Sequence, residues 1–237
     1  MTPTENRLFV AEIFHSIQGE GELTGVPSVF VRLSGCNLRC VWCDTPYASW
    51  TPRGIRMSIE EILAAIAPFP SRHAVITGGE PVIARDIHAL CLALREHGYH
   101  LTIETAGTVP PGNVACDLAS ISPKLSHSIP RSDQVGEAWV RRHEHRRLSV
   151  SALRDWIRDY SFQLKFVVAE PEDLGEIEEL LAQLGDIPPH RVQLMPEGTT
   201  PESLHAKSQW VVEQCLRKGY RYCDRLHLRL FGNTPGT

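Results

Sequence analysis

Length, composition and charge limit the kind of protein that this chain can be. Its 237 residues suffice for one α/β domain with a substantial core, and a content of 42% hydrophobic and 22% charged residues excludes a disordered or low-complexity chain. The net charge of −4 gives no general attraction to nucleic acid, so no nucleic-acid partner is expected. No apolar run approaches the roughly 18 residues of a membrane span, and residues 1–7 are polar without a signal-peptide core. We therefore expect no membrane association and a cytoplasmic location.

Short β-rich runs alternate with segments of helical periodicity along the chain. This alternation is typical of a mostly parallel sheet with crossover helices. The expected strands, in chain order, are Leu8–Ile13, Val29–Leu33, His73–Thr77, His100–Glu104, Asp117–Ile121, Gln163–Val168, Arg191–Met195 and Tyr222–Leu230. Because the chain has no internal repeat and no linker rich in Pro, Gly or Ser, we interpret residues 1–237 as a single domain.

Helices are expected between these strands. Ser58 and Glu61 have the spacing of a capping box before an apolar run, and Pro68 and Pro70 end that helix. Apolar residues spaced three or four apart predict further core-facing helices at 83–94, before Gly98, at 174–184 and at 204–216.

The segment 122–149 departs from this pattern because its apolar periodicity is weak. Long irregular segments inside compact domains are usually functional or mobile, so we expect a long insertion or lid. Its basic cluster consists of Arg141, Arg142, His143, His145, Arg146 and Arg147. We interpret them as a solvated charged face, with a lid or a docking surface for an acidic electron-donor protein as the alternative.

Three of the seven cysteines fall within residues 36–43, directly after an expected strand: Cys36, Cys40 and Cys43. This crowding is unsuited to a disulfide framework and favours a metal centre in a reducing compartment. A structural zinc would need a fourth ligand, and no fourth cysteine is near. Three thiolates around a cubane iron–sulfur cluster instead leave one iron open to a reactant. The dispersed cysteines are expected to be packed thiols: Cys91, Cys116, Cys215 and Cys223.

The Cys-x₃-Cys-x-aromatic-Cys spacing, with Trp42 as the aromatic residue, resembles the signature of radical S-adenosylmethionine enzymes. There, three cysteines hold a 4Fe-4S cluster whose fourth iron binds S-adenosyl-L-methionine. A second motif, Thr77-Gly78-Gly79-Glu80-Pro81, resembles the element that holds the cofactor's amino group. Its glycines permit close approach of the backbone, and the Glu80 carboxylate or nearby carbonyls suit an ammonium group. The resemblance implies a partial, TIM-like (βα)6-type barrel with both motifs at the carboxyl ends of the strands.

Further segments narrow the resemblance to the 7-carboxy-7-deazaguanine synthase family, over essentially the whole chain. These segments are residues 14–21, 25–27, 30–33, 43–45, 104–108 and 122–124 and the C-terminal region around His227. The resemblance implies a carbon–nitrogen lyase that converts 6-carboxy-5,6,7,8-tetrahydropterin to 7-carboxy-7-deazaguanine with loss of ammonia. The product belongs to queuosine and 7-deazapurine biosynthesis, which includes tRNA modification. A flavodoxin- or ferredoxin-type reductant and a homodimer are further implications.

The resemblance also implies which residues bind the pterin: Ile17, Gln18, Gly19, Glu20, Arg32 and Thr77. Gln18 offers a paired donor and acceptor to a heterocycle edge, and Arg32 offers a planar fork to a carboxylate. The alternatives are that Arg32 points from its strand to solvent and that Glu20 belongs to a simple turn. Glu104 is expected near the barrel mouth as a catalytic proton shuttle, with a structural contact as the alternative.

Cofactor contacts are implied in the same way. For S-adenosylmethionine they are Gly78, Gly79, Glu80, Ser122, Pro123, Lys124, Gln193 and Pro196. The chain reads Gln-Leu-Met-Pro at 193–196 where the family commonly reads Gln-Pro-Met-Asp. Mg²⁺ is expected on the hydroxyl of Thr45, completed by water and substrate oxygens, and the alternative role of Thr45 is in a turn before Pro46.

Two other functions compete with this interpretation. A glycyl-radical-enzyme activase shares the three-cysteine loop but acts on a protein backbone, and Gln18, Glu20, Arg32 and Thr45 argue instead for a small carboxylated heterocycle. The non-catalytic alternative is an iron–sulfur electron carrier or a zinc-binding module, which binding of S-adenosylmethionine to the reconstituted cluster would reject.

Overall fold

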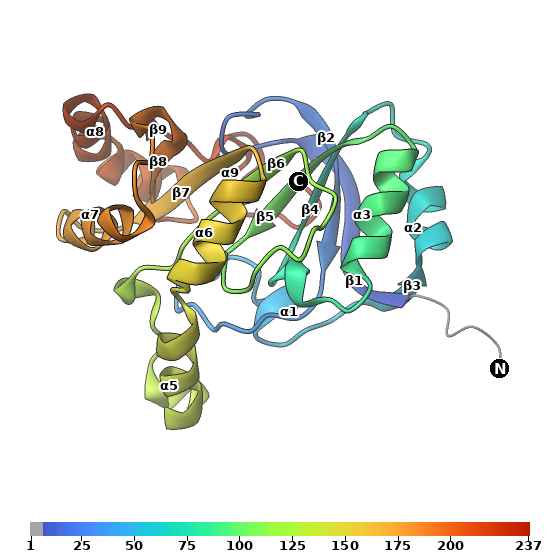
Figure 1. Ribbon diagram of the computed structural model, residues 1–237, viewed down its shortest axis with the longest axis horizontal. Helices are drawn as coiled ribbons and strands as arrows, with labels where there is room; N and C mark the ends of the chain where they lie inside the picture. Colours follow the sequence, from blue (N-terminus) through green and yellow to red (C-terminus); the bar gives the residue numbers. More distant parts are fainter. Residues whose placement is uncertain (1–6) are drawn as a thin grey trace.

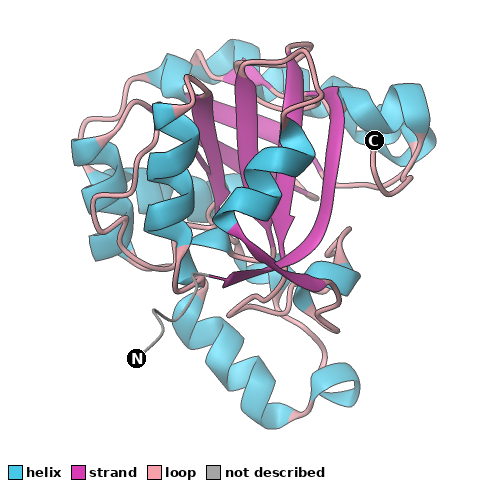
Figure 2. Cartoon of the chain, turned by 90° about the vertical axis from the view of Figure 1, so that its right-hand side faces the viewer, coloured by secondary structure: helices cyan, strands magenta, loops and turns pink. Residues whose placement is uncertain are grey.

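A single sheet forms the centre of the computed structural model, which describes residues 7–237. Of the polar residues 1–7 that predict no signal peptide, all but Arg7 lie outside the described residues. The nine strands follow the order β3-β1-β2-β4-β5-β6-β7-β8-β9, with β3 and β9 at the edges, so the sheet is not closed. Successive strands from β2 to β9 in this order pair in parallel, whereas β1 is antiparallel to β2 and β3. Figure 2 shows the sheet with helices packed around it, which agrees with the predicted partial barrel.

The elements alternate along the chain as the hydrophobic pattern predicts (Figure 1). The strands are β1 (Arg7–Ile17), β2 (Pro27–Leu33), β3 (Ile55–Ser58), β4 (His73–Gly78), β5 (His100–Thr105), β6 (Leu118–Ile121), β7 (Phe162–Val168), β8 (Val192–Pro196) and β9 (Arg221–Tyr222). The α-helices are α1 (Pro46–Ser49), α2 (Ile59–Ile66), α3 (Ile87–Glu96), α4 (Ser132–Val135), α5 (Glu137–Arg146), α6 (Val150–Asp159), α7 (Asp173–Leu184), α8 (Pro201–Lys218) and α9 (Leu226–Phe231). Short 3₁₀ turns are η1 (Pro81–Ile83), η2 (Ser126–Ser128) and η3 (Pro189–Arg191).

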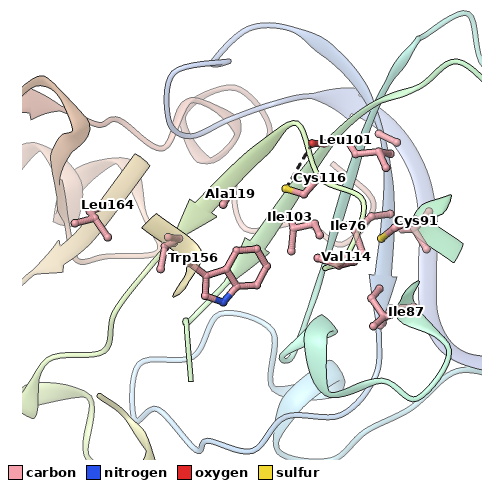
Figure 3. Close-up of a cluster of buried hydrophobic side chains, with 14 of the residues drawn as sticks. Ile76, Ile87, Cys91, Leu101, Ile103, Val114, Cys116, Ala119, Trp156 and Leu164 are labelled. Atoms are coloured by element: carbon pink, nitrogen blue, oxygen red, sulfur yellow. Dashed lines mark hydrogen bonds between the residues drawn. The ribbon is translucent and has the colours of Figure 1, made fainter. Parts of the chain in front are cut away.

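The main core lies between the outer face of the sheet and the helices. Strand residues such as Ile76 and Ile103 contact helix residues such as Ile87 and Trp156 there (Figure 3). The four dispersed cysteines are all buried, as predicted. The thiol of Cys116, for example, donates a hydrogen bond to the backbone oxygen of Leu101 (3.9 Å, Figure 3).

Local signals fix several element ends. Ser58 and Glu61 make the predicted reciprocal capping box, and α2 ends at Ile66, before Pro68. The first seven expected strands are all present, although β1 extends to Ile17, where it pairs with Pro27 of β2. Pairing with β2 therefore extends β1 beyond its apolar run.

The last expected strand, Tyr222–Leu230, is wrong beyond its first residue. β9 ends at Tyr222, and α9 begins at Leu226. The alternation of polar and apolar residues from His227 to Leu230 resembles a strand, but only two residues of β9 pair with β8. The prediction that the apolar stripe of α8 extends in the core to Leu216 is also wrong, because that side chain is 79% exposed.

The segment 122–149 contains η2, α4 and α5 rather than one long irregular loop. The helix α5 projects from the barrel in both views (Figures 1 and 2). Two members of the basic cluster do not belong to a solvated face: His143 is fully buried, and Arg147 is ion-paired with Glu144 and Glu176. Arg141, Arg142 and Arg146 are exposed, as expected.

Candidate functional site

A cavity of about 450 Å³ lies at the carboxyl ends of the parallel strands. Small-molecule sites span roughly 300–1,000 Å³, so its size suits one. Residues near the strand ends line it: Arg32 of β2, Thr77 of β4, Glu104 of β5, Lys165 of β7 and Met195 of β8. The loop after β2 and the double glycine after β4 also line it, as predicted for a barrel of this kind.

Three thiols of the loop after β2 face this cavity: Cys36, Cys40 and Cys43. None of them is in a disulfide. Burial raises the pKa of Cys36 and of Cys40 to about 12. Among residues 7–237, no three His, Cys, Asp or Glu side chains converge on a point that would hold a single metal ion. An iron–sulfur cluster needs no such point because each thiolate binds a different iron, so the donor set fits a cluster better than a zinc ion.

Backbone contacts hold the cysteine loop against the double glycine. The amide of Gly79 donates to the oxygen of Leu33 (3.1 Å), and the amide of Glu80 donates to the oxygen of Gly35 (2.9 Å). A Cβ atom on Gly79 would lie 2.2 Å from the Gly35 oxygen, and one on Gly78 would lie 2.0 Å from the Leu33 oxygen. Glycine is therefore required at both positions, and the two motifs form one unit.

The Glu80 carboxylate does not line the cavity. It accepts hydrogen bonds from the Thr105 hydroxyl (2.8 Å), the Ala106 amide (2.8 Å) and the Val82 amide (3.3 Å). Burial raises the pKa of Glu80, although these hydrogen bonds act in the opposite direction. Glu80 thus fastens the turn to the end of β5 and leaves the backbone at the two glycines to face a ligand.

A buried lysine joins two of the predicted site carboxylates. Lys165 Nζ lies 2.5 Å from Glu20 Oε2 and 2.9 Å from Glu104 Oε2. Gln18 Nε2 donates to the other oxygen of Glu104 (3.1 Å). Burial alone would lower the pKa of Lys165, but Glu104 and Glu20 outweigh it and raise that pKa above its usual range. We did not predict Lys165, although a lone charge inside the apolar strand Phe162–Val168 was a signal for it.

An arginine of the C-terminal region contacts Glu20 from the other side and joins it to Asp44. Arg225 Nε donates to Glu20 (3.0 Å), its Nη2 pairs with Asp44, and its Nη1 donates to the Gly198 oxygen (2.6 Å). Burial would raise the pKa of Glu20, but Lys165 and Arg225 outweigh it and hold that pKa well below its usual range. Arg225 was also missed, because the region was expected to be a strand.

The loop at Ile17–Glu20 lines the cavity with side chains and backbone. The His227 ring packs so closely on Gly19 that a Cβ there would lie 2.0 Å from Nδ1. His227 itself lines the cavity, and burial lowers its pKa. The structure therefore brings together two regions of the predicted site that are far apart in sequence.

Arg32 points into the barrel rather than to solvent. Its Nε donates to Glu12 (2.6 Å), which also accepts from the Tyr47 hydroxyl (2.6 Å). Within residues 7–237, no side chain or backbone oxygen accepts from the Nη atoms of Arg32, so these donors remain for a ligand. The hydroxyl of Thr45 also lines the cavity, 3.9 Å from the Cys43 sulfur.

The other expected cofactor contacts divide into two groups. Ser122 and Lys124 line the cavity, and Lys124 Nζ donates to the Ser122 hydroxyl (2.7 Å). Pro123, Gln193 and Pro196 do not line it. Gln193 instead donates to Gln163 (2.8 Å) in the barrel interior, while Met195 of the same strand reaches the cavity.

Known proteins are similar to this chain over most of its length. Residues 30–130 match the sequence family described as the Radical SAM superfamily. A 7-carboxy-7-deazaguanine synthase from Rhodopirellula baltica is 48% identical, covering 99% of this chain and 90% of that protein. One from Halobacterium salinarum is 45% identical, covering 96% and 92%. The crystal structure of QueE from Escherichia coli superposes with a TM-score of 0.70 at 28% identity, covering 93% of this chain and 95% of that one. Every helix among residues 7–237 is too short or too polar to cross a bilayer.

Proposed function

Because the chain belongs to the 7-carboxy-7-deazaguanine synthase family of radical S-adenosylmethionine enzymes, we propose that it converts 6-carboxy-5,6,7,8-tetrahydropterin to 7-carboxy-7-deazaguanine with loss of ammonia. One observation carries the proposal: a single cavity is lined both by the three loop thiols and by Gln18, Glu20 and Arg32. An electron carrier has no use for that second set. A glycyl-radical activase must admit a protein backbone, whereas this cavity suits a small molecule.

The cofactor side of the cavity follows from the residues that face it. Cys36, Cys40 and Cys43 would hold the 4Fe-4S cluster, and the backbone at Gly78 and Gly79 would meet S-adenosylmethionine. When bound, the two supply the one-electron chemistry that removes a hydrogen atom from the substrate. Ser122 and Lys124 are further contacts. The other expected contacts do not line the cavity and would instead support the residues that do: Glu80, Pro123, Gln193 and Pro196.

The substrate side recognises a flat, polar heterocycle that carries a carboxylate. The free Nη donors of Arg32 suit that carboxylate, and Gln18 with the ionised Glu20 suits the donor and acceptor edge of a pterin. Ile17, Gly19 and Thr77 complete this wall. Glu104, held by Lys165 and Gln18, is placed to move a proton at the ring.

We propose Mg²⁺ as a further cofactor, on the Thr45 hydroxyl. A single protein ligand is sufficient because Mg²⁺ keeps several waters and takes other oxygens from substrate. Asp44 beside it is ionised, since Arg225 outweighs burial and lowers its pKa. Titration of turnover with Mg²⁺, compared between the wild type and Thr45→Val, tests this assignment; an unchanged Mg²⁺ requirement in the variant would contradict it.

The enzyme also needs an external electron donor. We propose an acidic flavodoxin- or ferredoxin-type reductant that docks on the exposed Arg141, Arg142 and Arg146 of α5. The same helix touches the cysteine loop, so a reductant bound there would lie near the cluster.

A homodimer is expected from the family, and light scattering after gel filtration would measure the mass of the assembly. The loop thiols must stay reduced, which favours the cytoplasm. The product would enter queuosine or other 7-deazapurine biosynthesis.

Anaerobic turnover tests the proposed function. The reconstituted enzyme is incubated with the pterin, S-adenosylmethionine, dithionite and Mg²⁺, and the product is identified by mass spectrometry. Cys40→Ala should abolish the product, whereas Cys116→Ala, in the core behind the sheet, should retain it. Formation of 5′-deoxyadenosine by the wild type without 7-carboxy-7-deazaguanine would contradict the substrate assignment.

A further inference from the structure

The helix α5 is joined to the cysteine loop by a specific set of contacts. The Arg39 guanidinium lies over the Trp139 ring, with its central carbon 4.1 Å from the ring centroid, and Arg142 packs on the same ring at 4.5 Å. The base of the helix is fastened in turn, because Arg147 pairs with Glu176 of α7. The projecting helix of Figures 1 and 2 is therefore braced at both ends of its contact with the barrel.

His143 is the one buried residue of α5, and its tautomer is set by its neighbours. The Ser128 hydroxyl donates to the oxygen of Leu125 (2.6 Å), so its own oxygen accepts from His143 Nε2 (3.0 Å). The other ring nitrogen, Nδ1, is then unprotonated and accepts from the backbone amide of Arg39 (3.1 Å). Burial lowers the pKa of His143 to about 4, which agrees with a neutral ring at neutral pH.

A second hydrogen bond links Ser128 to Val41, the residue that follows Cys40. The backbone oxygen of Ser128 accepts from the amide of Val41 (2.9 Å). The amides that flank Cys40 on both sides are therefore directed to His143 and Ser128. Backbone amides near an iron–sulfur cluster can donate hydrogen bonds to its sulfur atoms, and such bonds are among the factors that set its reduction potential. A donor stabilises the more negative, reduced state and so makes the potential more positive.

We propose that His143 is a positioning residue that, together with Ser128, holds the amides of Arg39 and Val41 away from the cluster and so keeps its reduction potential low. The inference rests on the proposed function only in that the three loop cysteines hold a 4Fe-4S cluster. A low potential matters because the cluster must deliver an electron to a sulfonium group, which is a poor electron acceptor.

The test is the midpoint potential of the cluster, measured by a redox titration followed by electron paramagnetic resonance without substrate. His143→Leu cannot accept from the Arg39 amide, so its potential should shift to a more positive value. His143→Asn offers an oxygen near the place of Nδ1 and should restore the wild-type potential. The matched control is His145→Leu, an exposed histidine on the same helix, which should leave the potential unchanged.

An unchanged potential in His143→Leu with full iron and sulfide content would overturn the proposal, and so would equal shifts in His143→Leu and His143→Asn. If His143→Leu fails to hold iron, Ser128→Ala decides, because it frees Nε2 and lets the ring turn from the Arg39 amide. A positive shift in that variant supports the proposal, and its absence overturns it. A shifted potential in an enzyme that makes no 7-carboxy-7-deazaguanine would contradict the proposed function alone.

Discussion

Lys165 Nζ lies 2.5 Å from the Glu20 carboxylate although the two residues are 145 positions apart in the sequence. Lys165 is only 2% exposed, and it also binds Glu104, while Arg225 binds the second oxygen of Glu20. Three carboxylates, those of Glu20, Glu104 and Asp44, thus share two largely buried cations in the wall of the cavity. Such pairs add little net stability when complete, but loss of one partner leaves a buried charge uncompensated.

Lys165→Met is therefore expected to lower the free energy of unfolding by about 3 kcal/mol and to abolish turnover. Chemical denaturation followed by tryptophan fluorescence measures the first effect. Lys218→Met, which removes the ion pair to Glu178 at the surface, is the control and should cost less than about 1 kcal/mol. Equal effects in the two variants would show that the buried network has no special role.

Arg225→Lys keeps the charge but loses the planar fork that reaches Glu20, Asp44 and Gly198 together. We expect kcat/KM for the pterin to fall about tenfold or more, because Glu20 and Asp44 would no longer be held in place. Arg229→Lys is the matched control, since Arg229 pairs with Asp224 near the surface and does not line the cavity. A wild-type kcat/KM in Arg225→Lys would show that charge alone is sufficient.

Gly79→Ala should displace the cysteine loop, because the new Cβ would meet the Gly35 oxygen at 2.2 Å. The neighbour is backbone, so the strain cannot be relieved by a side-chain rotation. We expect binding of S-adenosylmethionine, followed by the change in the spectrum of the reduced cluster, to weaken about tenfold or more. Gly175→Ala, whose Cβ would meet open space on α7, should bind normally.

The neutral state of His143 predicts a pH dependence of stability. Burial, followed by Arg147, lowers its pKa, whereas Glu144 acts in the opposite direction. Below about pH 6.5 the unfolded chain binds a proton that the folded chain does not. The contribution of His143 to stability is therefore fully present above that pH and falls as the pH is lowered.

The measurement is the difference in free energy of unfolding between wild type and His143→Asn, both carrying the cluster. When the pH is lowered from about 7.5 to about 5.5, we expect the free energy of unfolding of the wild type to fall by about 1 kcal/mol relative to that of His143→Asn. A difference that is constant with pH would mean that His143 titrates normally in the folded protein.

Much of the fold was predictable because hydrophobic periodicity marks buried elements directly. The apolar strand at His73–Gly78 and the capping box at Ser58 have signals within a few residues of sequence. The C-terminal helix α9 has no such local signal, because His227 to Leu230 alternates between polar and apolar residues as a strand does. The chain turns there because Arg225 contacts Glu20 and Asp44 and His227 packs on Gly19. That cause is tertiary and cannot be read from a local window.

The candidate site shows the same division. The cysteine loop and the double glycine are contiguous motifs, so the sequence predicts them and their shared edge of the barrel. Lys165 and Arg225 are single residues whose meaning depends on Glu20, which lies far away in the sequence. Conversely, Glu80 belongs to a matching motif and Gln193 to a partly matching one, but both face other protein groups, which only the side-chain contacts reveal.

The most direct test of the account uses 6-carboxytetrahydropterin deuterated at the carbon that bears the carboxylate. It is incubated anaerobically with the reconstituted enzyme, S-adenosylmethionine, dithionite and Mg²⁺, and both products are examined by mass spectrometry. If one cavity holds cofactor and substrate together, 7-carboxy-7-deazaguanine will form and deuterium will appear at the 5′ carbon of the adenosyl group, in 5′-deoxyadenosine or in recovered S-adenosylmethionine. Both are examined because loss of ammonia is redox-neutral, so the hydrogen atom taken from the substrate must be returned. Unlabelled 5′-deoxyadenosine without that product would contradict the shared site and the proposed reaction.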